Sequence, residues 1–500
     1  MLTYDMHNRG ELGLYEYLYR CIRADIISGA IAADDRLPSK RALAQHLGVS
    51  VVTVEGAYRQ LAAEGYIRSV PCRGYYANAL VAMPHTNAPS AAAAQCETDR
   101  DMDLSQFAQQ ATPDSLLASA DDAAGFSTSQ HTFDLSSALL PEGIFPYTTW
   151  ARCVRDVLSQ EPENELLTSH DSFGSQKLRS AICDYLHNWR GMDVAPAQVV
   201  VGAGAQVLYN LIVQLVGRNR LVALEDPGYP RLAQIYSVND AETVAISLDE
   251  QGIDVKQLAA SGASVAHIMP SHQYPTGIVT SIARRYELLG WAAADASRII
   301  IEDDYDCELR LAGRPVPSLQ SIDTCGQVVY INTFAKTLGA AFRIGYVVLP
   351  ARMAEEFRKK LGFYSSTVSA VDQLALARFI REGDYERHVN RLRTHCRGVR
   401  DALVAQLKAS SVGDKLVFEQ LDSGIHFMLG VQDARAEQEL VDLASQHGVR
   451  ILPISSFARA ANGSLHLLNA SCKWFFVTYV SLQSQETPAL VSAIEQAWSE

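Results

Sequence analysis

Five short apolar segments in the middle of the chain alternate with helical patterns, and this alternation constrains the fold more than any other feature. The apolar segments lie at 198–202, 221–225, 265–269, 298–302 and 328–331. Short apolar runs bounded by turn residues are typical of buried strands, and strands separated by helices form βαβ units. We therefore expect a mostly parallel sheet whose functional site lies at the carboxyl ends of its strands. From about residue 350 the pattern changes to a long helical region and then to a small α+β part.

A lysine follows the last of these segments. Thr333-Phe334-Ala335-Lys336-Thr337 leaves the strand, so Lys336 has small and apolar neighbours. Desolvation lowers the pKa of an amine and frees the lone pair that a Schiff base requires. Arg343 and the Thr333 hydroxyl are suited to hold a phosphate beside it. Taken alone, the segment also fits a surface lysine that follows a strand.

The preceding strand ends in acids and a tyrosine. Its sequence is Ser-Arg-Ile-Ile-Ile-Glu-Asp-Asp-Tyr, residues 297–305, and Asp306 follows it. Pyridoxal phosphate (PLP) needs an acid at its ring nitrogen, which suits Asp303, and Tyr305 can reach the ring hydroxyl. Together with Thr-Phe-Ala-Lys-Thr-Leu and Arg343, this stretch resembles fold-type-I aminotransferases. More narrowly, it resembles the MocR/GabR family of bacterial regulators, in which a GntR-type winged helix-turn-helix is fused to an aminotransferase-like domain.

The charge of the chain is unevenly distributed. The 500 residues carry a net charge of −13, which is unfavourable for nucleic-acid binding by the whole surface. Residues 1–80, however, hold nine Lys and Arg against eight Asp and Glu, whereas residues 81–131 hold one against seven. Any DNA contact therefore belongs to the first 80 residues.

Cysteine usage and hydropathy exclude several other classes of protein. The nine cysteines form no Cys-x-x-Cys pair and are odd in number, so we expect neither a zinc site nor a disulfide framework. No stretch is apolar and long enough for a membrane span, and the N-terminus lacks the pattern of a secretory signal. We expect a cytoplasmic protein without a metal site.

The first 80 residues have the pattern of a helix-turn-helix. Gly29 ends a first helix, and Ser39 is a suitable N-cap for a second helix that runs to about Leu47. After Gly48, Ser50 caps a third helix, which such proteins offer to the major groove. A hairpin, or wing, follows at 66–76. A small helical module that binds protein is the alternative, but helix-turn-helix and wing occur together, in the order of GntR-type domains.

By this resemblance, DNA contacts come from three places. They are Ser39, Lys40 and Arg41 at the start of the second helix, Ser50, Val52 and Thr53 at the start of the recognition helix, and Arg73 and Gly74 in the wing. Serine, threonine and lysine are expected to fix phosphates, while Arg41 or Arg73 can read a guanine edge.

Residues 81–131 contain few large apolar side chains and a run of acids. Such a segment cannot bury enough surface to fold, so we expect an acidic flexible linker, with at most a short helix at 104–117. The domains are therefore expected at 1–80 and 132–500, the second being an α/β fold-type-I domain with a small α+β C-terminal subdomain.

Further segments of the large domain match the aminotransferase pattern in order. A glycine-rich turn at 202–206 leads from a strand into a helix, so N–H groups of Gly204, Ala205 and Gln206 are expected at the PLP phosphate. Tyr229 is expected to stack on the pyridine ring. His272 is either a cofactor neighbour or a histidine satisfied within its loop.

The chain departs from catalytic relatives at several positions. Ser169, His170 and Ser172 replace the usual Tyr, Gly and Pro, and alanine replaces the usual hydroxyl residues at 203 and 205. An arginine that holds the substrate carboxylate belongs at or next to Phe476 by pattern, yet the strand reads Lys-Trp-Phe-Phe-Val-Thr. Because phenylalanine cannot pair with a carboxylate, we expect PLP binding without efficient transamination.

The sequence thus predicts a PLP-binding transcriptional regulator that forms a homodimer, binds double-stranded DNA and senses PLP or an amine. Two alternatives stay open: a working aminotransferase with an appended regulatory module, and a regulator whose large domain has lost PLP and only dimerises.

Overall fold

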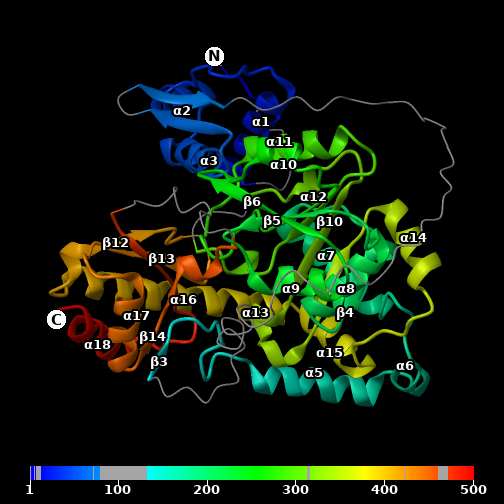
Figure 1. Ribbon diagram of the computed structural model, residues 1–500. Coiled ribbons are helices and arrows are strands. Elements are labelled where there is room, and N and C mark those ends of the chain that lie inside the picture. The colour runs from blue at the N-terminus through cyan, green and yellow to red at the C-terminus, as the bar shows by residue number, and fades with distance from the viewer. Residues whose placement is uncertain are drawn as a thin grey trace.

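The computed structural model describes residues 2–4, 6, 13–70, 73–78, 132–311, 316–422, 424–459 and 471–499. The predicted linker and its short helix lie outside these residues. Three bodies are visible in Figure 1: a winged domain, a large α/β body and a C-terminal subdomain. In the described part of the chain, no helix is long and apolar enough to cross a membrane.

The winged domain has the predicted helices and hairpin. Its elements are α1 (Leu14–Ser28), α2 (Lys40–Leu47), α3 (Val51–Ala63), β1 (Ile67–Val70) and β2 (Gly74–Ala77). The Ser39 side chain caps α2 by accepting from the Ala42 N–H, and the Ser50 side chain caps α3 by accepting from the Thr53 N–H. Gly29 ends α1 in the left-handed region, where glycine has no Cβ to clash.

The large body is built on an eight-stranded sheet of order β4-β11-β10-β9-β8-β5-β6-β7. The strands are β4 (Val199–Gly202), β5 (Val222–Asp226), β6 (Thr243–Asp249), β7 (Gly252–Ile253), β8 (Val265–Ile268), β9 (Ile299–Asp303), β10 (Val328–Thr333) and β11 (Gly345–Val348). Strands β6, β5, β8, β9 and β10 run parallel in succession, whereas β11 is antiparallel to both its neighbours and β7 is antiparallel to β6. The predicted mostly parallel sheet is confirmed.

Helices cover this sheet, so its strands are largely buried, with β6 the most exposed of them. The helices are α5 (Tyr147–Gln160), α6 (Glu163–Leu167), α7 (Gln176–Arg190), α8 (Ala205–Val216), α9 (Pro230–Val238), α10 (Val255–Ala260), α11 (Ile282–Ala293), α12 (Leu319–Ile322), α13 (Ala335–Leu338), α14 (Ala351–Leu361) and α15 (Ala370–Arg381). Helices α8, α9 and α14 share one apolar core with the sheet, and α10, α11 and α12 share another. Figure 1 shows α5 and α15 together at the edge farthest from the winged domain.

The C-terminal subdomain follows the long helix α16 (Asp384–Ala409). It contains β12 (Leu416–Glu419), β13 (His426–Val431), α17 (Glu437–Gln446), β14 (Val449–Arg450), β15 (Leu452–Pro453), β16 (Lys473–Thr478) and α18 (Thr487–Ser499). Its four-stranded sheet has the order β12-β13-β16-β15, and β14 pairs with β3 (Phe133–Asp134) from the start of the domain. The C-terminal subdomain therefore includes β3, a strand that is remote from it in sequence.

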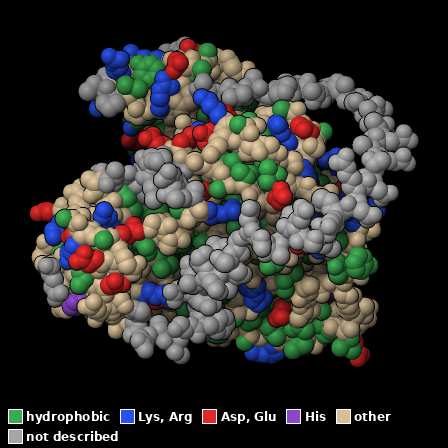
Figure 2. All heavy atoms as spheres, viewed as in Figure 1, with side chains coloured by type: hydrophobic (Ala, Val, Ile, Leu, Met, Phe, Trp, Pro, Cys, Tyr) green, Lys and Arg blue, Asp and Glu red, His purple; other side chains and the backbone are tan. Residues whose placement is uncertain are grey.

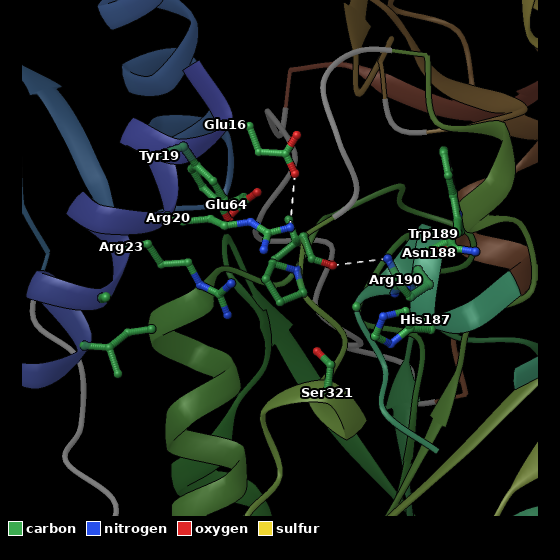
Figure 3. Close-up of a pocket in the computed structure, with 15 residues that line it drawn as sticks. Glu16, Tyr19, Arg20, Arg23, Glu64, His187, Asn188, Trp189, Arg190 and Ser321 are labelled. Carbon is green, nitrogen blue, oxygen red and sulfur yellow. Dashed lines mark hydrogen bonds and ion pairs between the residues drawn. The ribbon is translucent and has the colours of Figure 1, made fainter. Parts of the chain in front are cut away.

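The winged domain packs on α11 of the large body. The Ile282 N–H donates to the Glu64 carbonyl over 3.3 Å, and Ile282 and Tyr286 belong to the apolar core of the winged domain. Beside this contact lies a cleft of about 580 Å³. Figure 3 shows Arg20 and Arg23 extending into it from α1, with His187 and Arg190 from the end of α7 opposite.

Candidate cofactor site and nucleic-acid interface

Lys336 lies in α13, directly after β10, at the carboxyl edge of the sheet. Burial lowers the pKa of its amine, the Asp306 carboxylate acts in the opposite direction, and the Arg231 guanidinium lowers the pKa further. The predicted desolvated lysine is therefore present. An amine with a lowered pKa is the kind of group that forms covalent bonds to carbonyl compounds.

Asp303 ends β9, the strand next to β10, with a buried carboxylate. The Tyr209 hydroxyl donates to Oδ2 of Asp303, and His267 Nε2 lies 3.5 Å from the same oxygen. A buried carboxylate with one firm donor keeps lone pairs for another N–H group. This geometry suits the ring nitrogen of a pyridinium.

The two acids that flank Asp303 are held by buried arginines. Glu302 contacts Arg285 of α11 at 3.3 Å, and Asp304 contacts Arg190 at the end of α7 at 2.6 Å. Side chains alternate along a strand, so Asp303 is directed away from these two partners. The side chains of both ion pairs are at most 1% exposed. These pairs therefore hold the end of β9 on the side opposite the Asp303 side chain.

The turn before α8 and Arg343 form a compact cradle. Gly204 has a φ of +83°, and Ala205 and Gln206 open the helix with their side chains half-buried. Arg343 Nη2 donates to the Ala203 carbonyl over 3.3 Å. The first N–H groups of a helix have no partner within it, so the turn and the guanidinium together suit a phosphate.

Thr333 is engaged within the protein. Its hydroxyl donates to the Ile344 carbonyl over 3.2 Å and accepts from the Ala335 N–H over 3.2 Å. Its predicted contact with a phosphate therefore requires the hydroxyl to turn, and it stays a prediction.

Tyr229 immediately precedes α9 and meets Tyr274 edge to face, with ring centroids 5.5 Å apart. Arg231, two residues later, hydrogen-bonds Tyr229 and influences Lys336 electrostatically. The sequence analysis missed this cation. Its position two residues after Tyr229, in the first turn of α9, was the signal that could have identified it.

His272 and Tyr305 lie together beside Asp306. His272 Nδ1 is 2.7 Å from Asp306 Oδ2 and 3.3 Å from the Tyr305 hydroxyl. Burial raises the pKa of Tyr305 well above its usual range, so the phenol stays protonated. His272 is thus both hydrogen-bonded within its loop and adjacent to a predicted cofactor ligand.

Aromatic rings surround Phe476, the position at or next to which the aminotransferase pattern has a carboxylate-binding arginine. Phe476 lies on β16 and is 3% exposed, in contact with Tyr274, Phe457 and His426 at centroid distances of 5.2, 5.8 and 4.5 Å. An ionised carboxylate buried among these rings would lack a charged partner, which is costly.

The residues present fit PLP. A Cβ on Gly204 would lie 2.8 Å from Arg343 Nη2, so only glycine lets the guanidinium close the cradle. Lys336, Asp303, Tyr305 and this cradle all follow or adjoin strand ends of one sheet. Lysine, acid, phenol and anion cradle are the donor set that PLP requires.

The predicted DNA-binding residues lie at the start of α2, the start of α3 and the wing. Val52 is 76% exposed at the start of α3. The hydroxyls of Ser50 and Thr53 lie 2.8 Å apart, and Ser39 and Ser50 cap their helices. These serines therefore have a structural role in addition to any phosphate contact.

Basic residues of the same surface differ in their surroundings. Lys40 Nζ donates to Glu55 over 2.8 Å and lies over the Tyr75 ring. Arg41 and Arg73 are exposed, and Gly74 begins β2 with a φ of +108°. Figure 2 shows basic side chains on the outer part of the winged domain and acidic ones where it meets the large body.

Comparison with known proteins defines the class of the molecule. Residues 14–76 match the model of bacterial regulatory proteins of the gntR family, and residues 138–472 match the model of aminotransferase class I and II. The Pyrococcus horikoshii kynurenine aminotransferase aligns with a TM-score of 0.64 at 20% identity, over 79% of this chain and 96% of that chain. Escherichia coli YbdL, a methionine aminotransferase, aligns with a TM-score of 0.63 at 21% identity, over 79% and 100%. The large domain thus has the fold-type-I aminotransferase fold.

Relatives that align over most of this chain are named as transcriptional or regulatory proteins. The chain is 34% identical to the HTH-type transcriptional regulator YdeL of Bacillus subtilis, over 89% of this chain and 90% of that protein. It is 30% identical to the probable rhizopine catabolism regulatory protein MocR of Rhizobium meliloti, over 89% and 87%. It is also 28% identical to the pyridoxine biosynthesis transcriptional regulator PdxR of Corynebacterium glutamicum, over 87% of each chain. The chain belongs to the MocR/GabR family of HTH-type transcriptional regulators with an aminotransferase-like domain.

Proposed function

We propose that this regulator binds PLP covalently through Lys336 and uses the state of that site to control how its winged domains bind operator DNA. The observation that carries the proposal is the desolvated Lys336 amine at the same sheet edge as Asp303 and the Gly204–Arg343 cradle. PLP supplies a carbonyl carbon that reacts with amines and a ring that withdraws electrons.

Each residue has a distinct role in holding the cofactor. Lys336 would provide the attachment point, Asp303 would keep the ring nitrogen protonated, and Tyr305 would donate to the ring hydroxyl. Tyr229 would stack on the ring, and His272 would contact the Tyr305 hydroxyl. The phosphate would lie on the N–H groups of 204–206 with Arg343 and Thr333.

The site is proposed to sense PLP or an amine with little turnover. Phe476 and its aromatic neighbours occupy the part of β16 where a cation for a substrate carboxylate would lie. The Arg231 guanidinium, which acts electrostatically on Lys336, is a cation suited to a carboxylate and favours a working transaminase as the alternative.

DNA binding is assigned to Ser39, Lys40, Arg41, Ser50, Val52, Thr53, Arg73 and Gly74. A cytoplasmic homodimer would present two winged domains to double-stranded operator DNA, and an effector that favours one arrangement of the dimer would change operator affinity.

The test is an absorption spectrum of protein reconstituted with PLP, compared with Lys336→Ala. The wild type should show the visible band of a lysine-linked pyridoxal group, and the variant should not. Lys359→Ala, on an exposed position of α14, is the matched control and should keep the band. A wild type without the band would contradict the proposal and favour a dimerisation scaffold. Rapid loss of the band with common amino acids, with release of oxo acid at turnover rates, would favour the transaminase.

A further inference from the structure

Two buried histidines meet between the large body and the C-terminal subdomain. The rings of His272 and His426 are stacked, with centroids 4.1 Å apart and planes at 25°. Gly424 permits this approach, because a Cβ there would lie 2.4 Å from Nδ1 of His272. Asp306 completes the cluster at 2.7 Å from His272 Nδ1.

The hydrogen bonds define which nitrogen of each ring carries the proton. His272 Nδ1 faces a carboxylate, which only accepts, so Nδ1 carries a proton. His426 hydrogen-bonds the backbone of Pro275, which has no N–H, so its carbonyl is the acceptor. Since Nε2 is the nitrogen of His426 without a partner, Nδ1 is the donor. His426 Nε2 therefore has a lone pair and is an acceptor.

A lone pair left without a donor in the protein interior is expensive. Leaving a buried polar group unsatisfied forfeits its solvation without compensation, and such groups in native structures call for an explanation. Burial and the nearby Lys336 and His272 hold the pKa of His426 well below its usual range, so protonation does not relieve the cost. A ligand that donates a hydrogen bond does relieve it.

The surroundings decide what kind of ligand fits. His426 contacts Phe476 at 4.5 Å, and both lie on paired strands, β13 and β16. Tyr274 and Phe457 add further rings, whose faces attract cations. A metal ion fits poorly, because it must lie in the plane of each ring that binds it and the two planes are stacked.

We propose that the effector is an amine with a second hydrogen-bond donor, a diamine or an amino alcohol, and that His426 Nε2 accepts from this second group. The end of the ligand beside β13 and β16 is then an ammonium or hydroxyl, where catalytic relatives hold a carboxylate. This inference rests on the proposed binding of PLP at Lys336.

The experiment titrates the PLP-loaded full-length protein with four amines of similar length and follows the visible band. The amines are putrescine, aminobutanol, butylamine and γ-aminobutyrate. Putrescine and aminobutanol should shift the band at roughly tenfold lower concentration than the other two, as expected for one hydrogen bond to a buried acceptor.

Two variants of His426 distinguish the role of its Nε2 acceptor from the structural role of the side chain. His426→Asn keeps a donor near the Nδ1 position and removes the Nε2 acceptor, whereas His426→Gln keeps an acceptor near Nε2. The preference should disappear in the first variant and remain in the second. The effect of putrescine on operator affinity, measured by fluorescence anisotropy, should likewise be lost in His426→Asn and kept in His426→Gln. Thermal melting should show that both variants fold.

Three results would overturn the inference. They are tightest binding of γ-aminobutyrate, equal effects of all four amines, and a preference unchanged in His426→Asn. A wild type with no visible band would instead refute the proposed function, so the two failures are distinguishable.

Discussion

The guanidinium of Arg343 lies so close to the backbone of Gly204 that a Cβ at residue 204 would be 2.8 Å from Nη2 and 2.9 Å from Cζ. Arg343 itself has a φ of +48°, in the left-handed region. The cradle proposed for the phosphate therefore depends on a glycine and an arginine that are 139 positions apart in the numbering. A side chain at residue 204 would therefore displace the Arg343 guanidinium.

Gly204→Ala should weaken PLP binding by about tenfold or more, because the methyl group displaces Arg343 and strains a residue at φ +83°. Gly262→Ala is the control: it has a φ of +76° and no atom within 4 Å of the added Cβ. Titration of the visible band measures both. Equal loss of affinity in the two variants would show that backbone strain, and not Arg343, is responsible.

Glu225 should make stability depend on pH. Burial raises its pKa from 4.5 to about 8, and its carboxyl group accepts from the Met269 N–H. The folded protein therefore retains a proton that the unfolded chain releases, so this stabilisation is complete below pH 4.5 and is lost as pH rises toward 8. The loss is about 1.4 kcal/mol per pH unit at most. Melting temperatures of wild type should fall relative to Glu225→Gln between roughly pH 6 and 8, and parallel curves would refute the raised pKa.

Removal of one partner from the Arg190–Asp304 pair should be strongly destabilising. The side chains are 1% exposed, and Arg190→Met would leave the Asp304 carboxylate buried without its cation. The expected cost is about 3–5 kcal/mol. Arg152→Met at the surface pair with Glu382, where the arginine is 44% exposed, should cost under about 1 kcal/mol. Urea unfolding of the large domain compares them, and similar midpoints would contradict the prediction.

The exposed arginines of the winged domain should contribute to DNA binding through charge. Arg41→Ala and Arg73→Ala should each weaken operator binding and reduce the slope of log affinity against log salt by about one. Arg352→Ala, exposed on α14, should leave affinity and slope unchanged. Anisotropy titrations at several salt concentrations test this, and an unchanged slope in both winged-domain variants would move the interface elsewhere.

Local sequence determined most of the secondary structure. Ser39 and Ser50 cap helices because their side chains accept from N–H groups three residues later, and Gly29 and Gly48 end helices because they adopt positive φ. The short apolar runs before Asp303 and Lys336 form neighbouring parallel strands, and such runs are typical of strands that are buried on both faces. The order of these motifs was enough to predict the fold class and the regulatory family, which the comparisons confirm, whereas the PLP site stays a prediction.

Tertiary structure decided what lies between remote segments. The stacking of His272 on His426, the proximity of Arg231 to Lys336, and the contact of Arg343 with Gly204 join residues whose spacing carries no periodic signal. The same is true of Ile282 and Tyr286, which complete the core of the winged domain from a helix of the large body. Hydrogen bonds and helix caps act over a few residues and are visible in sequence, whereas these contacts depend on how whole strands and helices pack.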